Sequence, residues 1–107
     1  MSIHVFEIYQ GPLKLGAANY PRPMLVVAQA TSAHSPAILA ISTQISTYYR
    51  PGIDFLIEKT DPDFSATGLV ADSFVDCMFQ IEMPPDVKRI GCLQNDLLRR
   101  FRKHYGI

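Results

Sequence analysis

Short runs of apolar residues, separated by turn-forming residues, dominate most of the chain. Runs of this length without helical spacing are typical of β-strands. We therefore predict five strands and one further short strand, over Ile3–Tyr9, Met24–Ala28, Ala37–Ile41, Ile53–Ile57, Ser73–Ile81 and Lys88–Leu93.

Stretches rich in Pro, Gly and Asp predict the loops between these strands. Gly11-Pro12 is expected to end the first strand, and a loop is expected to run from there to Pro21. Lys59–Gly68 is predicted to be a second loop, in which we expect Asp61 and Asp63 to be solvated or turn-forming.

Only the C-terminal segment has helical spacing. Apolar residues recur three or four positions apart and basic residues fill much of the opposite face, which predicts a helix over Asn95–Tyr105. Asn95 is expected to cap this helix and Gly106 to end it. The predicted fold class is mainly β (β+α), a small β-barrel of five or six strands with a C-terminal helix.

The length of 107 residues predicts a single domain over residues 1–107. The formal net charge is zero, yet residues 54–87 contain eight acidic residues and one lysine, whereas residues 88–107 contain six basic residues and one aspartate. Such asymmetry indicates contact with a charged polymer, two surfaces that pair with each other, or simply solvated faces.

Composition also limits the kinds of chemical site and the cellular location that we expect. Cys77 and Cys92 lie in apolar patterns and are expected to be reduced core thiols. The three histidines are too scattered to predict a metal site, and we expect no cofactor. The opening residues lack a signal-peptide pattern and no run reaches 18 apolar residues, so we expect a cytoplasmic protein without a membrane span.

Two polar residues stand at the edges of predicted strands. Arg22 precedes the strand Met24–Ala28, and Ser42 follows the strand Ala37–Ile41. Functional side chains are common where loops meet a rigid sheet, although most arginines before a proline are ordinary surface residues.

At these points the sequence resembles the MazF/PemK toxins. Four segments carry the resemblance, in the order in which that family has them. They are Arg22-Pro23-Met24-Leu25-Val26-Val27 (R-P-x-L-V-V), Ile41-Ser42-Thr43-Gln44-Ile45 (I-[ST]-x-Q-I), Thr67-Gly68-Leu69 with Ser73, Val75 and Cys77 (T-G-L-x-x-x-S-x-V-x-C), and Arg89-Ile90-Gly91 with Leu93 (K-I-G-x-L).

The resemblance implies an SH3-like barrel and a metal-independent endoribonuclease of a toxin–antitoxin system. Enzymes of this family cut single-stranded RNA by attack of the substrate's 2′-hydroxyl on the adjacent phosphate. Arg22 then matches the catalytic arginine, and Ser42 takes the place of the catalytic threonine. The arginine fork suits a phosphate because it matches the phosphate oxygens and keeps its charge.

Further candidates for RNA binding lie just after Ser42. Thr43 and Gln44 belong to the same motif, and Gln44 matches a family glutamine near the substrate groove. The run Tyr48-Tyr49-Arg50 offers aromatic rings that stack on unpaired bases, unless the tyrosines pack on the barrel instead. The resemblance also implies a homodimer and a cognate antitoxin as partners.

Alternatives stay open at this point. The chain lacks the family's Glu-Gln before Arg22 and has Glu82 where a basic or polar residue is usual, so a nuclease-dead binding copy of the fold is possible. The opening Ile3-His4-Val5-Phe6 and the ending Tyr105-Gly106-Ile107 resemble the CcdB-type gyrase poisons, which share this fold. In that family the terminal residues contact DNA gyrase.

Overall fold

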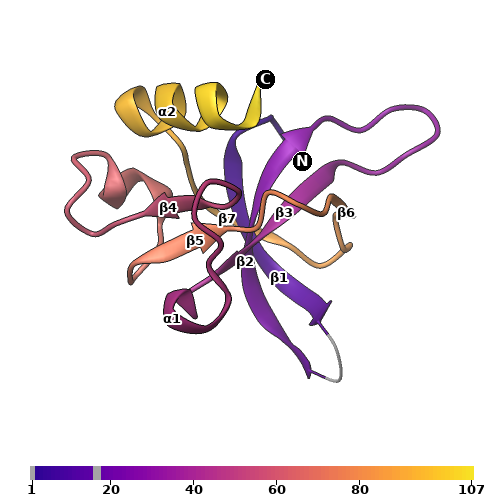
Figure 1. Ribbon diagram of the computed structural model, residues 1–107. Helices are drawn as coiled ribbons and strands as arrows, with labels where there is room; N and C mark the ends of the chain where they lie inside the picture. The colour runs from indigo at the N-terminus through magenta and orange to yellow at the C-terminus, as the bar shows by residue number, and fades with distance from the viewer. Residues whose placement is uncertain (1, 16–17) are drawn as a thin grey trace.

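The computed structural model describes residues 2–15 and 18–107 and contains a curled antiparallel sheet with a helix at its C-terminal end (Figure 1). The strand order is β4-β5-β3-β2-β1-β7, and β6 pairs separately with β3. The strands are β1 (Glu7–Leu15), β2 (Ala18–Ala28), β3 (Ala37–Ser42), β4 (Phe55–Ile57), β5 (Ser73–Val75), β6 (Ile81–Glu82) and β7 (Lys88–Cys92). The helical elements are α1 (Ile45–Tyr48), the 3₁₀ turn η1 (Phe64–Thr67) and α2 (Asn95–Tyr105). The predicted fold class, a mainly β small barrel with a C-terminal helix, is confirmed, and the sheet curls into a half-barrel of seven strands where five or six were predicted.

Two apolar clusters lie on opposite faces of the central strands. Leu25, Leu39 and Ile41 face α2, whose Leu97 and Phe101 are fully buried against them. The second cluster contains Tyr9 and the alternate residues of the same strands, which are Met24, Val26, Ile38 and Ala40. This alternation is expected of strands that are buried on both faces.

The prediction that Gly11-Pro12 ends the first strand was wrong. β1 starts only at Glu7 and continues to Leu15, where it pairs with β2 as a long hairpin in which Pro12 lies opposite Pro21. The prolines are tolerated because β7 pairs with β1 only as far as Gln10, so β1 is an edge strand beyond that point. Gly11 itself lets the backbone approach closely, because a Cβ there would lie 2.7 Å from the carbonyl oxygen of Asp86.

The long strand predicted over Ser73–Ile81 is also divided in two. β5 ends at Val75 because side-chain carboxylates accept the next backbone N–H groups in place of a neighbouring strand. Cys77 N donates to Asp54 Oδ1 (3.2 Å), and Met78 N donates to Asp76 Oδ1 (3.0 Å). Residues 76–80 therefore form a loop before β6.

Helix α2 has the predicted bounds, but its cap is different from the one expected. The N-cap position is Gln94, and the carboxylate of Asp63 accepts hydrogen bonds from Asp96 N (3.1 Å) and Asn95 Nδ2 (3.2 Å). Gly106 ends the helix in the left-handed conformation (φ 87°), as predicted. The acidic loop thus caps a helix that is distant in sequence.

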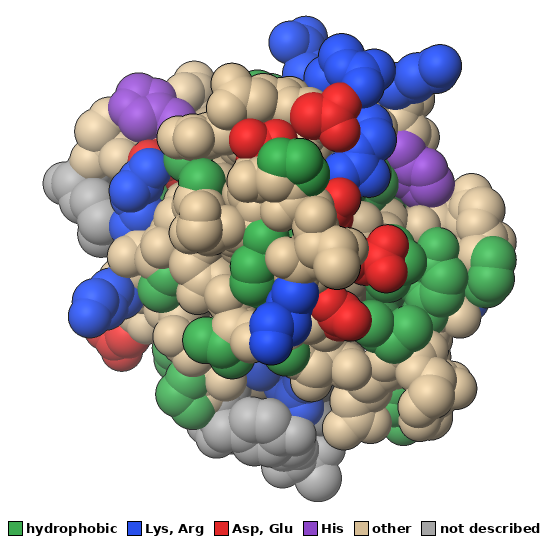
Figure 2. All heavy atoms as spheres, turned by 90° about the vertical axis from the view of Figure 1, so that its left-hand side faces the viewer, with side chains coloured by type: hydrophobic (Ala, Val, Ile, Leu, Met, Phe, Trp, Pro, Cys, Tyr) green, Lys and Arg blue, Asp and Glu red, His purple; other side chains and the backbone are tan. Residues whose placement is uncertain are grey.

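The acidic and basic segments also pair through α2. Arg100 Nη2 donates to Asp61 Oδ1 at 2.7 Å, and Asp61 Oδ2 accepts from Glu58 N in a local turn. Figure 2 shows basic side chains gathered at the top of the molecule, where α2 lies, with carboxylates directly beneath them. Part of the charge asymmetry is therefore internal pairing.

The described residues contain no helix with the length and apolar character of a membrane span.

Candidate functional site

The register of the central strands places Arg22 and Ser42 on one face of the sheet. β2 and β3 pair as far as Met24 opposite Ala40, and Arg22 and Ser42 lie two residues beyond that pair on their strands. On its other side, Ser42 lies opposite Phe74 of β5. Opposite residues of an antiparallel pair, and residues two positions apart on one strand, project to the same face, so these three side chains lie on one face as a row across three strands.

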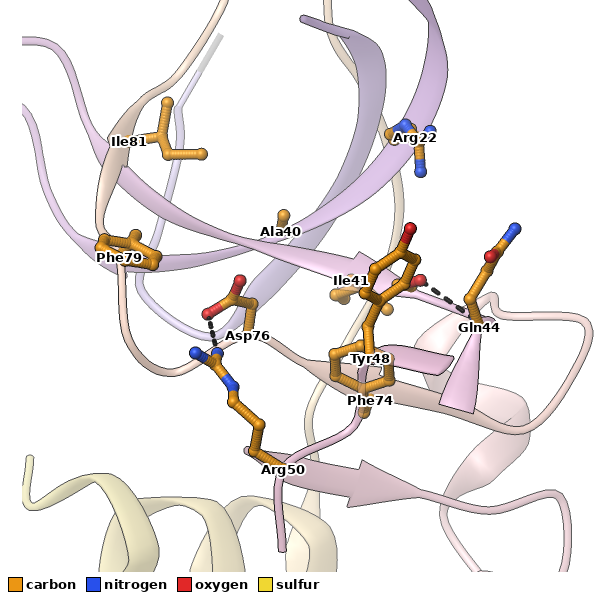
Figure 3. A pocket seen from close by; sticks show the side chains of 11 residues that line it. Arg22, Ala40, Ile41, Gln44, Tyr48, Arg50, Phe74, Asp76, Phe79 and Ile81 are labelled. Atoms are coloured by element: carbon orange, nitrogen blue, oxygen red, sulfur yellow. Dashed lines mark hydrogen bonds and ion pairs between the residues drawn. The ribbon is translucent and has the colours of Figure 1, made fainter. Parts of the chain in front are cut away.

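This row lies in a groove of about 730 Å³ (Figure 3). Arg22 stands on one side of it, and Tyr48 and Arg50 lie on the other, on and after α1. Phe79 and Ile81 lie at the far end from Gln44. The lining residues are Arg22, Ala40, Ile41, Ser42, Gln44, Tyr48, Arg50, Phe74, Asp76, Phe79 and Ile81.

The hydroxyl of Ser42 is held at the end of β3 by a short turn. Gln44 N donates to Ser42 Oγ at 3.1 Å. The oxygen is thereby fixed as an acceptor, which leaves the hydroxyl proton to donate to a ligand in the groove. Arg22, on β2, lines the same groove, so a guanidinium and a hydroxyl donor both border it.

Arg50 is held in place by two aspartates. Its Nε and Nη2 donate to Asp54 Oδ2 (3.0 Å) and Oδ1 (2.9 Å), and Nη2 also donates to Asp76 Oδ1 (2.8 Å). Burial alone would raise the pKa of Asp54, but the hydrogen bonds from Arg50 and Cys77 N outweigh it and hold that pKa below its ordinary value. Hydrogen bonding to Asp54 raises the pKa of Arg50 above its usual range. This bonding indicates that Arg50 acts more as a brace of the groove wall than as a mobile phosphate ligand.

The two tyrosines that were predicted to bind RNA, Tyr48 and Tyr49, have different surroundings. Tyr48 is 64% exposed and lines the groove, as stacking on a base requires. Tyr49 instead packs edge-on against Phe74, with ring centroids 5.8 Å apart. Thr43 is exposed, but it and Tyr49 are not among the described residues that line the groove.

Sequence reasoning missed the residues that the 76–80 loop brings to the groove. Asp76 lies opposite Ala40 and donates its backbone N–H to the Ala40 carbonyl at 2.9 Å. Phe79 is 63% exposed at the far end of the groove. The aspartate inside an apolar run was the available signal, because a fully buried strand accommodates a carboxylate poorly.

Other charged candidates lie away from the groove. Glu82 is not among its described lining residues, and its exposed carboxylate lies 3.8 Å from His34 Nδ1. The basic helix α2 lies above the strands and α1 below them (Figure 1), and no residue of α2 is among the described residues that line the groove. Of the charged residues that line the groove in the described part of the chain, two are arginines and one is an aspartate.

The three C-terminal residues are partly used by the fold. The ring of Tyr105 stacks on Phe101 with centroids 5.3 Å apart, and its hydroxyl accepts a hydrogen bond from Gln80 Nε2 (2.9 Å). Gly106 ends the helix, and Ile107 is exposed at 42%.

The cysteines are separate free thiols, both half-buried. Burial raises the pKa of Cys77 to about 11, so this thiol stays protonated at neutral pH. Within residues 2–15 and 18–107, no group of three His, Cys, Asp or Glu side chains is arranged to hold a metal ion.

No protein-family model matches this sequence, and no curated protein is significantly similar to it. Functional interpretation therefore depends on the residues of the groove and on the four motifs.

Proposed function

We propose that this protein is a metal-independent endoribonuclease of the MazF/PemK type, a toxin that cuts single-stranded RNA in the groove. The main observation in favour is the row of Arg22, Ser42 and Phe74, which sets a guanidinium, a hydroxyl and an aromatic ring in one open groove. The guanidinium and the hydroxyl suit the phosphate and the reacting oxygens of a nucleotide, and the exposed ring of Tyr48 in the same groove suits its base.

The proposed reaction is an internal transfer at one phosphate. The 2′-oxygen attacks the adjacent phosphorus, a bond to phosphorus forms, and the bond to the 5′-oxygen of the next nucleotide breaks. The products are a 2′,3′-cyclic phosphate and a 5′-hydroxyl, so the proton lost by the 2′-hydroxyl is matched by one gained at the 5′-oxygen. Arg22 stabilises the charge that builds up on the phosphoryl oxygens, and Ser42 donates a hydrogen bond to one of them.

The hydroxyl of Ser42 gives the first prediction. We expect Ser42→Ala to lower the rate of RNA cleavage by about 100-fold, because one donor to the developing charge is removed. Ser42→Thr should keep most of the activity, since the hydroxyl is retained and the side chain is only partly buried. Single-turnover cleavage of a labelled oligoribonucleotide in EDTA measures both rates.

That assay also tests the proposed function itself. Cleavage should leave a 2′,3′-cyclic phosphate, and a matching oligonucleotide with a 2′-deoxyribose at the scissile position should bind without being cut. A wild-type protein that binds RNA but never cuts it would favour the nuclease-dead copy of the fold. Equal rates for the wild type and Ser42→Ala would remove Ser42 from the site.

Gyrase poisoning is the second candidate, and the exposed Ile107 is the observation that favours it. We expect deletion of Gly106 and Ile107 to leave RNA cleavage within about two-fold of the wild type, because neither residue lines the groove. The same deletion should leave growth inhibition intact when the protein is expressed. Loss of toxicity on deletion, without any RNA cleavage by the full chain, would support the gyrase interpretation instead.

The proposed partners follow from the same assignment. They are single-stranded RNA, a cognate antitoxin that covers the groove, and a second copy of the chain in a homodimer. The proposed location is the cytoplasm, where such a toxin meets its RNA substrate.

A further inference from the structure

Asp76 is the one carboxylate among the described residues that line the groove. Its Oδ1 atom is fully engaged, since it accepts hydrogen bonds from Arg50 Nη2 (2.8 Å) and Met78 N (3.0 Å). These two donors fix the orientation of the carboxylate. Oδ2 accepts no hydrogen bond from any residue in the described part of the chain, and Figure 3 shows the second oxygen pointing away from Arg50.

Aromatic rings border the groove on both sides of Asp76 (Figure 3). Phe79 and Tyr48 are both mostly exposed, and Phe74 forms part of the floor. Exposed rings that line a groove suit the flat face of a nucleobase, because a base stacks well on such rings. A base that stacks there directs its hydrogen-bonding edge toward the groove wall, where Asp76 lies.

From this arrangement we infer that the groove contains a base subsite selective for guanine. The inference rests on the proposed binding of RNA and adds to it the identity of one base. Guanine presents two neighbouring donors on its Watson–Crick edge, N1–H and N2–H, and both suit a single carboxylate oxygen.

The other three bases fit this acceptor less well. Adenine and cytosine place a ring nitrogen acceptor beside their amino donor, so one lone pair would face the carboxylate. Uracil places a carbonyl oxygen on each side of its single N3–H donor. Each of these arrangements sets an acceptor against the negative oxygen of Asp76, which selects against the base.

The position of Asp76 separates this subsite from the reacting phosphate. Asp76 lies opposite Ala40, whereas Arg22 and Ser42 belong to the neighbouring row, two residues further along β3. The two rows are about 7 Å apart along the strand, which is close to the spacing of nucleotides in an extended chain. The guanine is therefore expected next to the scissile phosphate.

Asp76→Asn provides a matched test, because asparagine keeps an acceptor for Arg50 and Met78 N and replaces Oδ2 by an amide donor. We expect a labelled hexanucleotide U₃GU₂ to bind the wild type about 10-fold more tightly than U₆ does. In Asp76→Asn this preference should disappear, with the affinity for U₆ unchanged or higher. Phe79→Ala should weaken both oligonucleotides alike, by about 10-fold, since stacking is tolerant of sequence.

Fluorescence anisotropy with 2′-O-methyl oligonucleotides measures these affinities without cleavage, and thermal unfolding verifies that each variant is folded. Equal binding of U₆ and U₃GU₂ by the wild type, with cleavage intact, would overturn the guanine subsite and leave the proposed function standing. Failure of every oligonucleotide to bind or be cut would overturn both. If Asp76→Asn keeps the preference for guanine but cuts no sequence, Asp76 acts on the reaction and not on the base.

Discussion

Replacing Arg22 by alanine should lower the rate of RNA cleavage by about 100- to 1000-fold, the largest effect that we expect from any side chain of the groove. The guanidinium lies in the row with Ser42 and meets charge that builds up only as the phosphorus changes its bonding. An interaction of this kind lowers the barrier more than it strengthens binding. The dissociation constant for a 2′-deoxy substrate analogue should therefore change by much less than the rate.

Two variants make this result specific. Arg22→Lys should recover little of the rate, because an ammonium is a point charge and does not reproduce the planar fork. Arg99→Ala removes the same charge from an exposed position on α2, where the side chain pairs only with Asp96 among the described residues, and it should cut RNA at the normal rate. Normal cleavage by a folded Arg22→Ala protein would rule out the proposed active site.

The C-terminal helix was the easiest element to predict, because its signal is local. Apolar spacing, the change of period near Asn95 and the stop at Gly106 are all contained in a dozen consecutive residues. Its cap was missed because the capping carboxylate belongs to Asp63, more than thirty positions earlier. Sequence periodicity carries no information about such a partner.

The groove was predicted only in part, because some of its residues are also positioned by partners that are distant in the sequence. Arg22 and Ser42 were selected from strand edges and motifs, and the β2–β3 register places both in one groove. Asp76 and Phe79 were missed because residues 73–81 are mostly apolar and were interpreted as one strand. Two hydrogen bonds interrupt that strand: the one from Met78 N to Asp76 is local, but the one from Cys77 N to Asp54 joins positions that are distant in the sequence.

Asp54 thus connects the stability of the fold with the shape of the groove. Its side chain is fully buried, and it accepts hydrogen bonds from Arg50 N, Nε and Nη2 and from Cys77 N. We expect Asp54→Ala to lower the free energy of unfolding by about 3 kcal/mol, because two backbone donors and a guanidinium lose their acceptor. Denaturant unfolding measures this loss, and Asp86→Ala, which removes an exposed aspartate, should change stability by less than about 0.5 kcal/mol.

The pH dependence of the free energy of unfolding tests whether the charge of Asp54 provides this stability. The pKa of Asp54 in the folded chain lies below its ordinary value of 3.8, so the ionised carboxylate stabilises the fold above that value. This contribution is lost as the pH falls through the folded-state pKa. The wild type should therefore lose more stability than Asp54→Asn between about pH 6 and pH 3, and the two unfolding curves should approach each other in acid. Parallel losses in both proteins would mean that other carboxylates, such as Glu7 with its similarly lowered pKa, account for the acid sensitivity.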